Sequence, residues 1–158
     1  MRKRPAPPRA TGHPPRTTNA PKNAPQRAYS APPRVLVLEG APASGTNSKR
    51  LIKRGVRRFL VPSKAATTWK AGMVAQLQAA WRAAPITDLL AVTLHVYRAR
   101  NTGDTDNFAK PVLDAMQAAG VLCDDKIVTE LHLYRTLDRT RPRVVITLHA
   151  PTPLLEVA

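Results

Sequence analysis

The chain has little cysteine, few aromatic side chains and no long apolar run. Its single cysteine among 158 residues, Cys123, excludes an internal disulfide framework and a cysteine-rich zinc site. The longest apolar runs are short ones such as residues 35–38, well below the length of a membrane-spanning helix. The basic amino terminus lacks the apolar stretch of a secretory signal. We therefore expect one domain in a reducing, cytoplasmic setting, without a membrane partner.

Acidic residues are also scarce, because 10 Asp and Glu stand against 25 Lys and Arg and give a formal net charge of +15. Such an excess of positive charge predicts a polyanionic partner, with nucleic acid favoured over an anionic membrane surface. Charge alone does not separate a protein that binds nucleic acid from one that cuts it.

The positive charge and the proline are concentrated at one end. Residues 1–34 hold eight basic residues, nine of the 16 prolines and no acid. A segment of this composition cannot bury enough apolar surface to offset its ordering entropy, so we interpret it as a disordered basic arm. It either adds phosphate contacts or is a solvated tail. Residues 35–150 are the predicted domain, and residues 151–158 a tail.

Hydrophobic patterning in the domain predicts an α+β fold, with a mixed β-sheet and two main helices. One helix is expected from a Thr67 or Thr68 cap to Ala84, with an apolar stripe from Trp69 to Trp81 at intervals of four. The other runs from an Asp104 or Asp106 cap to Ala119, before Gly120. Residues 48–58 are hard to assign. Strands are expected at 34–39, 89–98, 126–135 and 143–149, the last two as a hairpin, with a short option at 59–61.

Five of the ten acids fall within residues 104–125, against the basic background. Asp104 and Asp106 are two residues apart at a strand-to-helix junction and can reach one cation. Asp125 joins them only if the strand that follows pairs beside the strand at 89–98. Carboxylates without cysteine or histidine suit Mg²⁺ or Mn²⁺. In a cationic protein, this combination indicates metal-dependent cleavage of a phosphodiester.

A structural interpretation of the same acids stays open. Aspartate commonly caps helices and forms turns, so Asp104 and Asp106 are alternatively N-caps, and the pair Asp124-Asp125 a turn. Lys110 follows Asp106 by four residues and precedes Asp114 by four, so the three share a helix face. It either holds the scissile phosphate or forms an ion pair, and Asp114 is expected to be its structural partner.

Residues 103–131, GDTDNFAKPVLDAMQAAGVLCDDKIVTEL, resemble the signature of RusA-type Holliday-junction resolvases. The shared features are a D-x-D-N run, a lysine four residues after its second Asp, an LDA helix and a DD pair before an apolar strand. The resemblance implies that Asp104, Asp106 and Asp125 are the catalytic carboxylates that bind the metal, and that Lys110 is a catalytic or phosphate-positioning lysine. It gives Asp124 an assisting role and leaves Asn107 and Asp114 structural roles. The basic arm and Cys123 depart from the family pattern.

The resemblance further implies a homodimer that uses Mg²⁺ to make paired nicks at a four-way junction in DNA recombination and repair. Proteins of this kind are typical of bacteria, phages and prophages. Two rival hypotheses stay open: a non-enzymatic basic nucleic-acid-binding protein, and a nuclease of the same fold that prefers flaps or other branched DNA. The junction arms are expected to contact basic residues in two stretches: Lys49, Arg50, Lys53, Arg54, Arg57, Arg58, Arg98 and Arg100.

Overall fold

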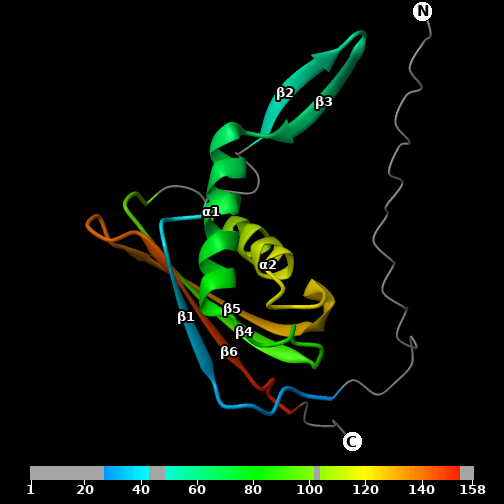
Figure 1. Cartoon of the computed structure of the whole chain (residues 1–158). Coiled ribbons are helices and arrows are strands. Elements are labelled where there is room, and N and C mark those ends of the chain that lie inside the picture. The colour runs from blue at the N-terminus through cyan, green and yellow to red at the C-terminus, as the bar shows by residue number, and fades with distance from the viewer. Residues whose placement is uncertain (1–26, 43–48, 102–103, 154–158) are drawn as a thin grey trace, which may run out of the picture.

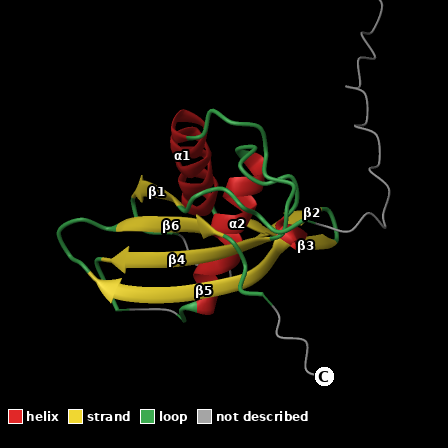
Figure 2. Cartoon of the chain, turned by 90° about the horizontal axis from the view of Figure 1, so that it is seen from below, coloured by secondary structure: helices red, strands yellow, loops and turns green. Residues whose placement is uncertain are grey.

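The computed structural model describes residues 27–42, 49–101 and 104–153. A four-stranded mixed sheet of order β1-β6-β4-β5 forms its centre. Both main helices, α1 (Lys64–Ala80) and α2 (Ala109–Ala118), lie on the same side of this sheet (Figures 1 and 2). The predicted α+β domain with a mixed sheet and two main helices is therefore confirmed. The strands of the sheet are β1 (Arg34–Glu39), β4 (Leu90–Arg98), β5 (Val128–Leu137) and β6 (Arg143–His149).

Alternating side chains place the core between the sheet and the helices. In β4, Val92, Leu94 and Val96 are almost fully buried, whereas the residues between them are half-exposed on the other face. The same alternation buries every second residue of β6. The bounds predicted for β1 and β6 are confirmed to the residue, and β4 begins one residue later than predicted.

The last two strands do not form the predicted hairpin. β4 pairs with β6 in antiparallel orientation and with β5 in parallel orientation, so it lies between them. The physical reason is burial: Val144, Ile146 and Leu148 are fully buried and suit an inner position, whereas most of β5 is exposed and suits an edge. The predicted start of β5 is also corrected, because a 3₁₀ turn, η2 (Asp125–Ile127), precedes it.

Helix α1 starts earlier and ends earlier than its pattern predicted. Ser63 is the N-cap, and its Oγ accepts a hydrogen bond from the Ala66 amide at 3.1 Å. Thr67 does not cap the helix, because its hydroxyl donates to the Ser63 carbonyl. Trp81 leaves the helical conformation and ends α1 at Ala80. The predicted apolar stripe is confirmed, since Met73, Leu77 and Trp81 are buried and Trp69 packs against the core.

A second, two-stranded sheet contains residues that could not be assigned from the sequence together with the short strand expected at 59–61, which lies within it. β2 (Lys49–Arg54) and β3 (Arg57–Pro62) pair around Gly55, whose φ of +60° favours glycine. Figure 1 shows this β2–β3 hairpin beyond the first turn of α1, apart from the four-stranded sheet. The hairpin that carries these basic residues therefore lies away from the domain centre.

The end of the segment assigned to the arm packs against the domain. The Tyr29 amide donates to the Leu89 carbonyl, the Leu89 amide donates to the Arg27 carbonyl, both at 2.7 Å, and the Tyr29 side chain is buried. Residues 1–26 of the predicted arm and residues 154–158 of the predicted tail lie outside the described residues. Thr152, which the tail prediction includes, hydrogen-bonds to the carboxylate of Glu130. No helix in the described ranges is long and apolar enough to span a membrane.

Candidate active site

The first pair of acids lies in the turn that leads into α2. A 3₁₀ turn, η1 (Asp106–Phe108), precedes the helix, and Phe108 occupies its N-cap position without a side-chain cap. The expectation that Asp104 or Asp106 caps this helix is therefore wrong. Instead, Oδ2 of Asp104 accepts from Nδ2 of Asn107 at 3.4 Å, and both carboxylates belong to exposed residues. This leaves two carboxylates accessible at one end of α2.

The second pair of acids follows the helix after a defined reversal of the chain. Gly120 ends α2 with a φ of +77°, as predicted, and its amide donates to the Gln117 carbonyl at 3.1 Å. The Val121 amide donates to the Met116 carbonyl at 2.9 Å, which completes a Schellman motif with two buried side chains. The motif turns the chain back along α2 toward η2 and the acidic pair.

Lys110, in the first turn of α2, contacts the second acidic turn. Its Nζ lies 3.7 Å from Oδ2 of Asp125 and 3.2 Å from Oδ1 of Asp114. The ion pair expected with Asp114 is therefore present, and the parallel pairing of β5 with β4 brings Asp125 to the same place. The hydrogen bond and charge of Asp114, followed by the charge of Asp125, raise the pKa of Lys110. Lys110 is thus held as a cation, although 76% of its side chain is exposed.

The two acids of the second pair have different environments. Asp124 is the N-cap of η2: its Oδ1 accepts from the Lys126 amide at 3.1 Å, and its Oδ2 lies 3.7 Å from Lys126 Nζ. The backbone hydrogen bond from Lys126 is the main cause that lowers the pKa of Asp124. The turn interpretation is thus confirmed for Asp124. Asp125 instead faces Lys110.

The donor set fits a hard cation in its chemistry. Asp104, Asp106 and Asp125 offer carboxylate oxygens, which are the ligands that Mg²⁺ and Mn²⁺ prefer. In the part of the chain that the structure describes, no three side chains of Asp, Glu, His or Cys already form a group able to hold a metal ion. The described histidines lie elsewhere: His95 stacks on Tyr97 with ring centroids 4.3 Å apart, and His132 stacks on His149.

The basic residues expected to contact DNA lie in two separate places. The first group is on the β2–β3 hairpin: Lys49, Arg50, Lys53, Arg54, Arg57 and Arg58. The second group lies at the end of β4, where Cζ of Arg98 is 4.4 Å from the centroid of the Phe108 ring. Arg98 therefore contacts η1, the turn that contains Asp106. For Arg54, only the backbone is described.

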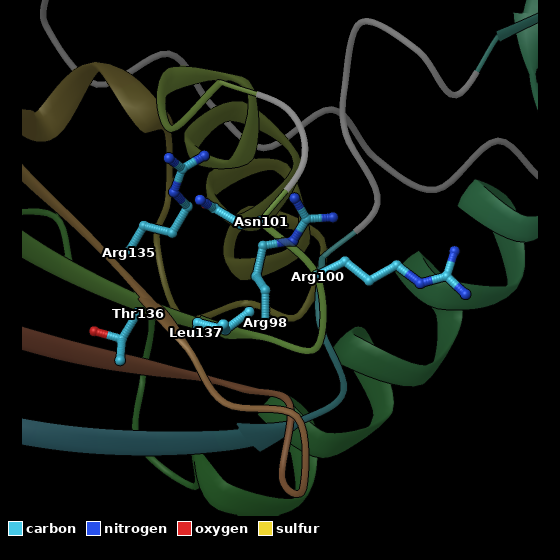
Figure 3. A pocket seen from close by; sticks show the side chains of 6 residues that line it. All are labelled: Arg98, Arg100, Asn101, Arg135, Thr136 and Leu137. Carbon is cyan, nitrogen blue, oxygen red and sulfur yellow. The ribbon is translucent and has the colours of Figure 1, made fainter.

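A pocket at the end of β4 contains residues that the sequence reasoning missed. Arg98 and Arg100 line it together with Asn101, Arg135, Thr136 and Leu137 (Figure 3). Arg135 is adjacent to Val96 only because β5 is parallel to β4. No local sequence signal distinguishes it from an ordinary exposed strand arginine, so the pairing of the strands had to be known first.

Comparison with protein families identifies the relationship of the chain. The family model described as endodeoxyribonuclease RusA matches residues 39–149, which include both acidic turns, α2 and the strands β4, β5 and β6. Of β1, only Glu39 falls inside the match. No curated protein matches the chain. The family match spans most of the chain, so the chain belongs to the RusA family of endodeoxyribonucleases.

Proposed function

We propose that this protein is a Mg²⁺-dependent endonuclease that resolves four-way DNA junctions by paired nicks in opposite strands. The observation that carries the proposal is the contact between Lys110 and Asp125, because it places the cation of α2 beside a carboxylate of the second acidic turn. Membership of an endodeoxyribonuclease family supports the reaction class. The positive charge of the chain supports a polyanionic substrate.

In this proposal, Asp104, Asp106 and Asp125 hold Mg²⁺, with Mn²⁺ as a substitute. A bound cation of this kind polarises a phosphoryl oxygen and lowers the pKa of water. Asn107 orients Asp104 through its hydrogen bond, and Asp124 fixes the turn that carries Asp125. In-line attack of water on the phosphodiester leaves a 5′-phosphate and a 3′-hydroxyl.

Lys110 is proposed to hold a phosphate oxygen at the site. Its exposed ammonium group lies beside Asp125, and the contacts with Asp114 and Asp125 raise its pKa further above neutral pH. Binding of the substrate would exchange one carboxylate partner of Lys110 for a phosphate oxygen. Asp114 keeps the stem of Lys110 on the correct side of α2.

The symmetry of the substrate supports a homodimer. A four-way junction needs two cuts in opposite strands, and a two-fold symmetric dimer presents two equal sites in opposite orientation. The β2–β3 hairpin of each subunit is proposed to contact a junction arm through its basic side chains. Its place beyond α1 gives these side chains a reach that the four-stranded sheet lacks (Figure 1).

The test uses a synthetic four-way junction and a linear duplex of the same sequence, each incubated with Mg²⁺ or with EDTA. We expect paired cuts in the junction with Mg²⁺, and no cuts with EDTA or with Asp106→Asn. Cleavage by Asp106→Asn at the wild-type rate would contradict the metal role. Preference for a flap substrate would change the substrate class. Salt-sensitive binding without cleavage, indifferent to Asp104 and Asp125, would support a non-enzymatic binder.

A further inference from the structure

The pocket at the end of β4 has an unusual lining for an exposed site. It has a volume of about 250 Å³ and is lined by three arginines, Asn101, Thr136 and Leu137, with no acidic residue. Asp138 directly follows Leu137 of the pocket lining. Its carboxylate accepts hydrogen bonds from the amides of Thr140 and Arg141 and from the guanidinium of Arg143. These partners all lie in the β5–β6 connection or at the start of β6, so Asp138 stabilises that connection.

The arginines of the pocket are close enough to affect one another. Partial burial and the nearby charge of Arg135 both lower the pKa of Arg98. In Figure 3, the polar ends of Arg98, Asn101 and Arg135 point to the same side, toward α2, whereas Arg100 points away from them. Like charges gathered in this way create a local positive potential, which favours a bound anion.

We infer that this pocket is a subsite for one phosphate of the DNA backbone, distinct from the phosphate that is cut. The inference rests on the proposed function, because it assigns the pocket to the same substrate strand. Arg98 and Arg135 supply planar donor forks that match phosphate oxygens, and Asn101 adds an amide donor. The hydroxyl of Thr136 lies 2.7 Å from Nε2 of His95 and points away from Arg98 and Arg135 (Figure 3), so it is not assigned to the phosphate.

The pocket is next to the candidate active site through a direct contact. Arg98 stacks over Phe108, and Phe108 lies between Asp106 and Lys110 in the chain. A phosphate held by Arg98 is thereby placed beside the turn that carries the catalytic carboxylates. The subsite would position the strand relative to the bond that is cut, rather than take part in the chemistry.

The first test compares Arg135→Gln with the matched control Arg139→Gln. Arg139 is four residues further along, exposed, and outside the pocket lining. Junction affinity is measured in EDTA over a range of salt concentrations. We expect Arg135→Gln to lose affinity about tenfold and to lower the salt slope by about 1. Arg139→Gln should change neither. Equal behaviour of the two variants would overturn the subsite.

The second test finds the phosphate itself. Junctions that carry a single neutral methylphosphonate at successive positions are bound to the wild type and to Arg135→Gln, again in EDTA. For the wild type, we expect one position near each cut site to lose affinity when it is neutralised. Arg135→Gln should lose the sensitivity at that position alone. Arg135→Lys, which keeps the charge without the planar fork, should give an intermediate result. An unchanged pattern in Arg135→Gln would overturn the inference.

The two proposals fail in different ways. If the wild type shows the position-specific pattern in EDTA but does not cut with Mg²⁺, the subsite stands and the nuclease assignment falls. If the wild type cuts and the pattern is independent of Arg135, the subsite falls and the nuclease assignment stands. Inorganic phosphate that shifts the NMR signals of Arg98, without any effect of Arg135→Gln on the methylphosphonate pattern, would indicate a free-anion site and overturn the DNA assignment.

Discussion

The Nζ atom of Lys110 lies 3.7 Å from Oδ2 of Asp125, although the two residues are far apart in the chain. The rest of α2, Gly120 and the loop before η2 lie between them. Two features produce this proximity. The Schellman motif at Gly120 reverses the chain, and the parallel pairing of β5 with β4 brings it back beside the sheet. A site that needs carboxylates from both ends of one crossover therefore depends on the whole β4–α2–β5 unit.

We expect the two adjacent acids Asp124 and Asp125 to have different roles, one structural and one catalytic. Asp125→Asn removes a proposed metal ligand, so we expect junction cleavage to fall by at least about a hundredfold with binding kept or tightened through reduced repulsion of phosphate. Asp124→Asn weakens the cap of η2, so it should lower the melting temperature slightly and leave most of the activity. Cleavage rates and binding isotherms measured on both variants check this. Equal loss of cleavage in the two would contradict it.

We also expect replacements of Lys110 and Asp114 to have different effects on cleavage. Lys110→Ala removes the proposed phosphate ligand, so cleavage should fall by about a hundredfold or more with the fold intact. Asp114→Asn breaks an exposed i,i+4 ion pair, which contributes little to stability because solvent screens it. We expect this variant to keep a near wild-type free energy of unfolding and to retain most of the cleavage rate. Urea unfolding and single-turnover cleavage are the measurements. A larger loss in Asp114→Asn than in Lys110→Ala would refute the assignment.

The β2–β3 hairpin should matter for DNA and little for stability. Lys53 and Arg58 are directly opposite in register, so their like charges repel when no anion is present. Replacing both with Gln should reduce junction affinity and lower the salt slope by about 2, without lowering the melting temperature. The control replaces Lys70, in α1, and Arg82, just after its end, with Gln, so it also removes two positive charges. A loss of affinity in the control equal to that in the hairpin variant would argue against a specific role of the hairpin.

We expect Asp138, in the β5–β6 connection, to make the folded state less stable as the pH falls into the acid range. Hydrogen bonds from the Arg141 amide, the Arg143 guanidinium and Thr140 lower the pKa of Asp138 in the folded state. Its stabilisation is therefore complete above the unfolded pKa of about 3.9 and is lost as the pH falls toward the folded pKa. Asp138→Asn should lower the melting temperature at pH 7 and change it less at about pH 3. A difference that stays constant with pH would contradict this.

Strands in which apolar and polar residues alternate regularly between turn residues could be predicted from the sequence. Features that depend on which distant strands pair with each other could not. β1 and β6 were located to the residue because apolar and polar residues alternate between clear breaks. The β2–β3 hairpin was missed because basic residues flank only a short apolar centre, Leu51 and Ile52, which pairs with Leu60 and Phe59. The polar link before β6 suggested a hairpin, because the sequence does not reveal that β4 lies between the two strands.

The candidate site likewise contains residues that local sequence predicts and residues that only the strand pairing reveals. Local spacing located Asp104, Asp106 and Lys110 around the start of α2, and the strand pairing expected to bring Asp125 to them is present. Asp125 lies beside Lys110, whereas the three carboxylates do not form one metal-holding group among the described residues. The role of Asp124 as a cap was one of two open alternatives, and only the position of its carboxylate decides it. Arg135 was missed because its neighbours in the pocket come from another strand.

The sheet order also determines when the domain can complete its fold during synthesis. β1 is the first strand of the domain to be made, and its only neighbour in the four-stranded sheet is β6, the last. The pairing of Val35 with Thr147 spans nearly the whole domain, and such long-range contacts form slowly. A nascent or truncated chain that ends before Arg143 keeps one edge of β4 open and β1 unpaired. Leu36 and Leu38 of β1, which the complete fold buries, are then uncovered and favour aggregation.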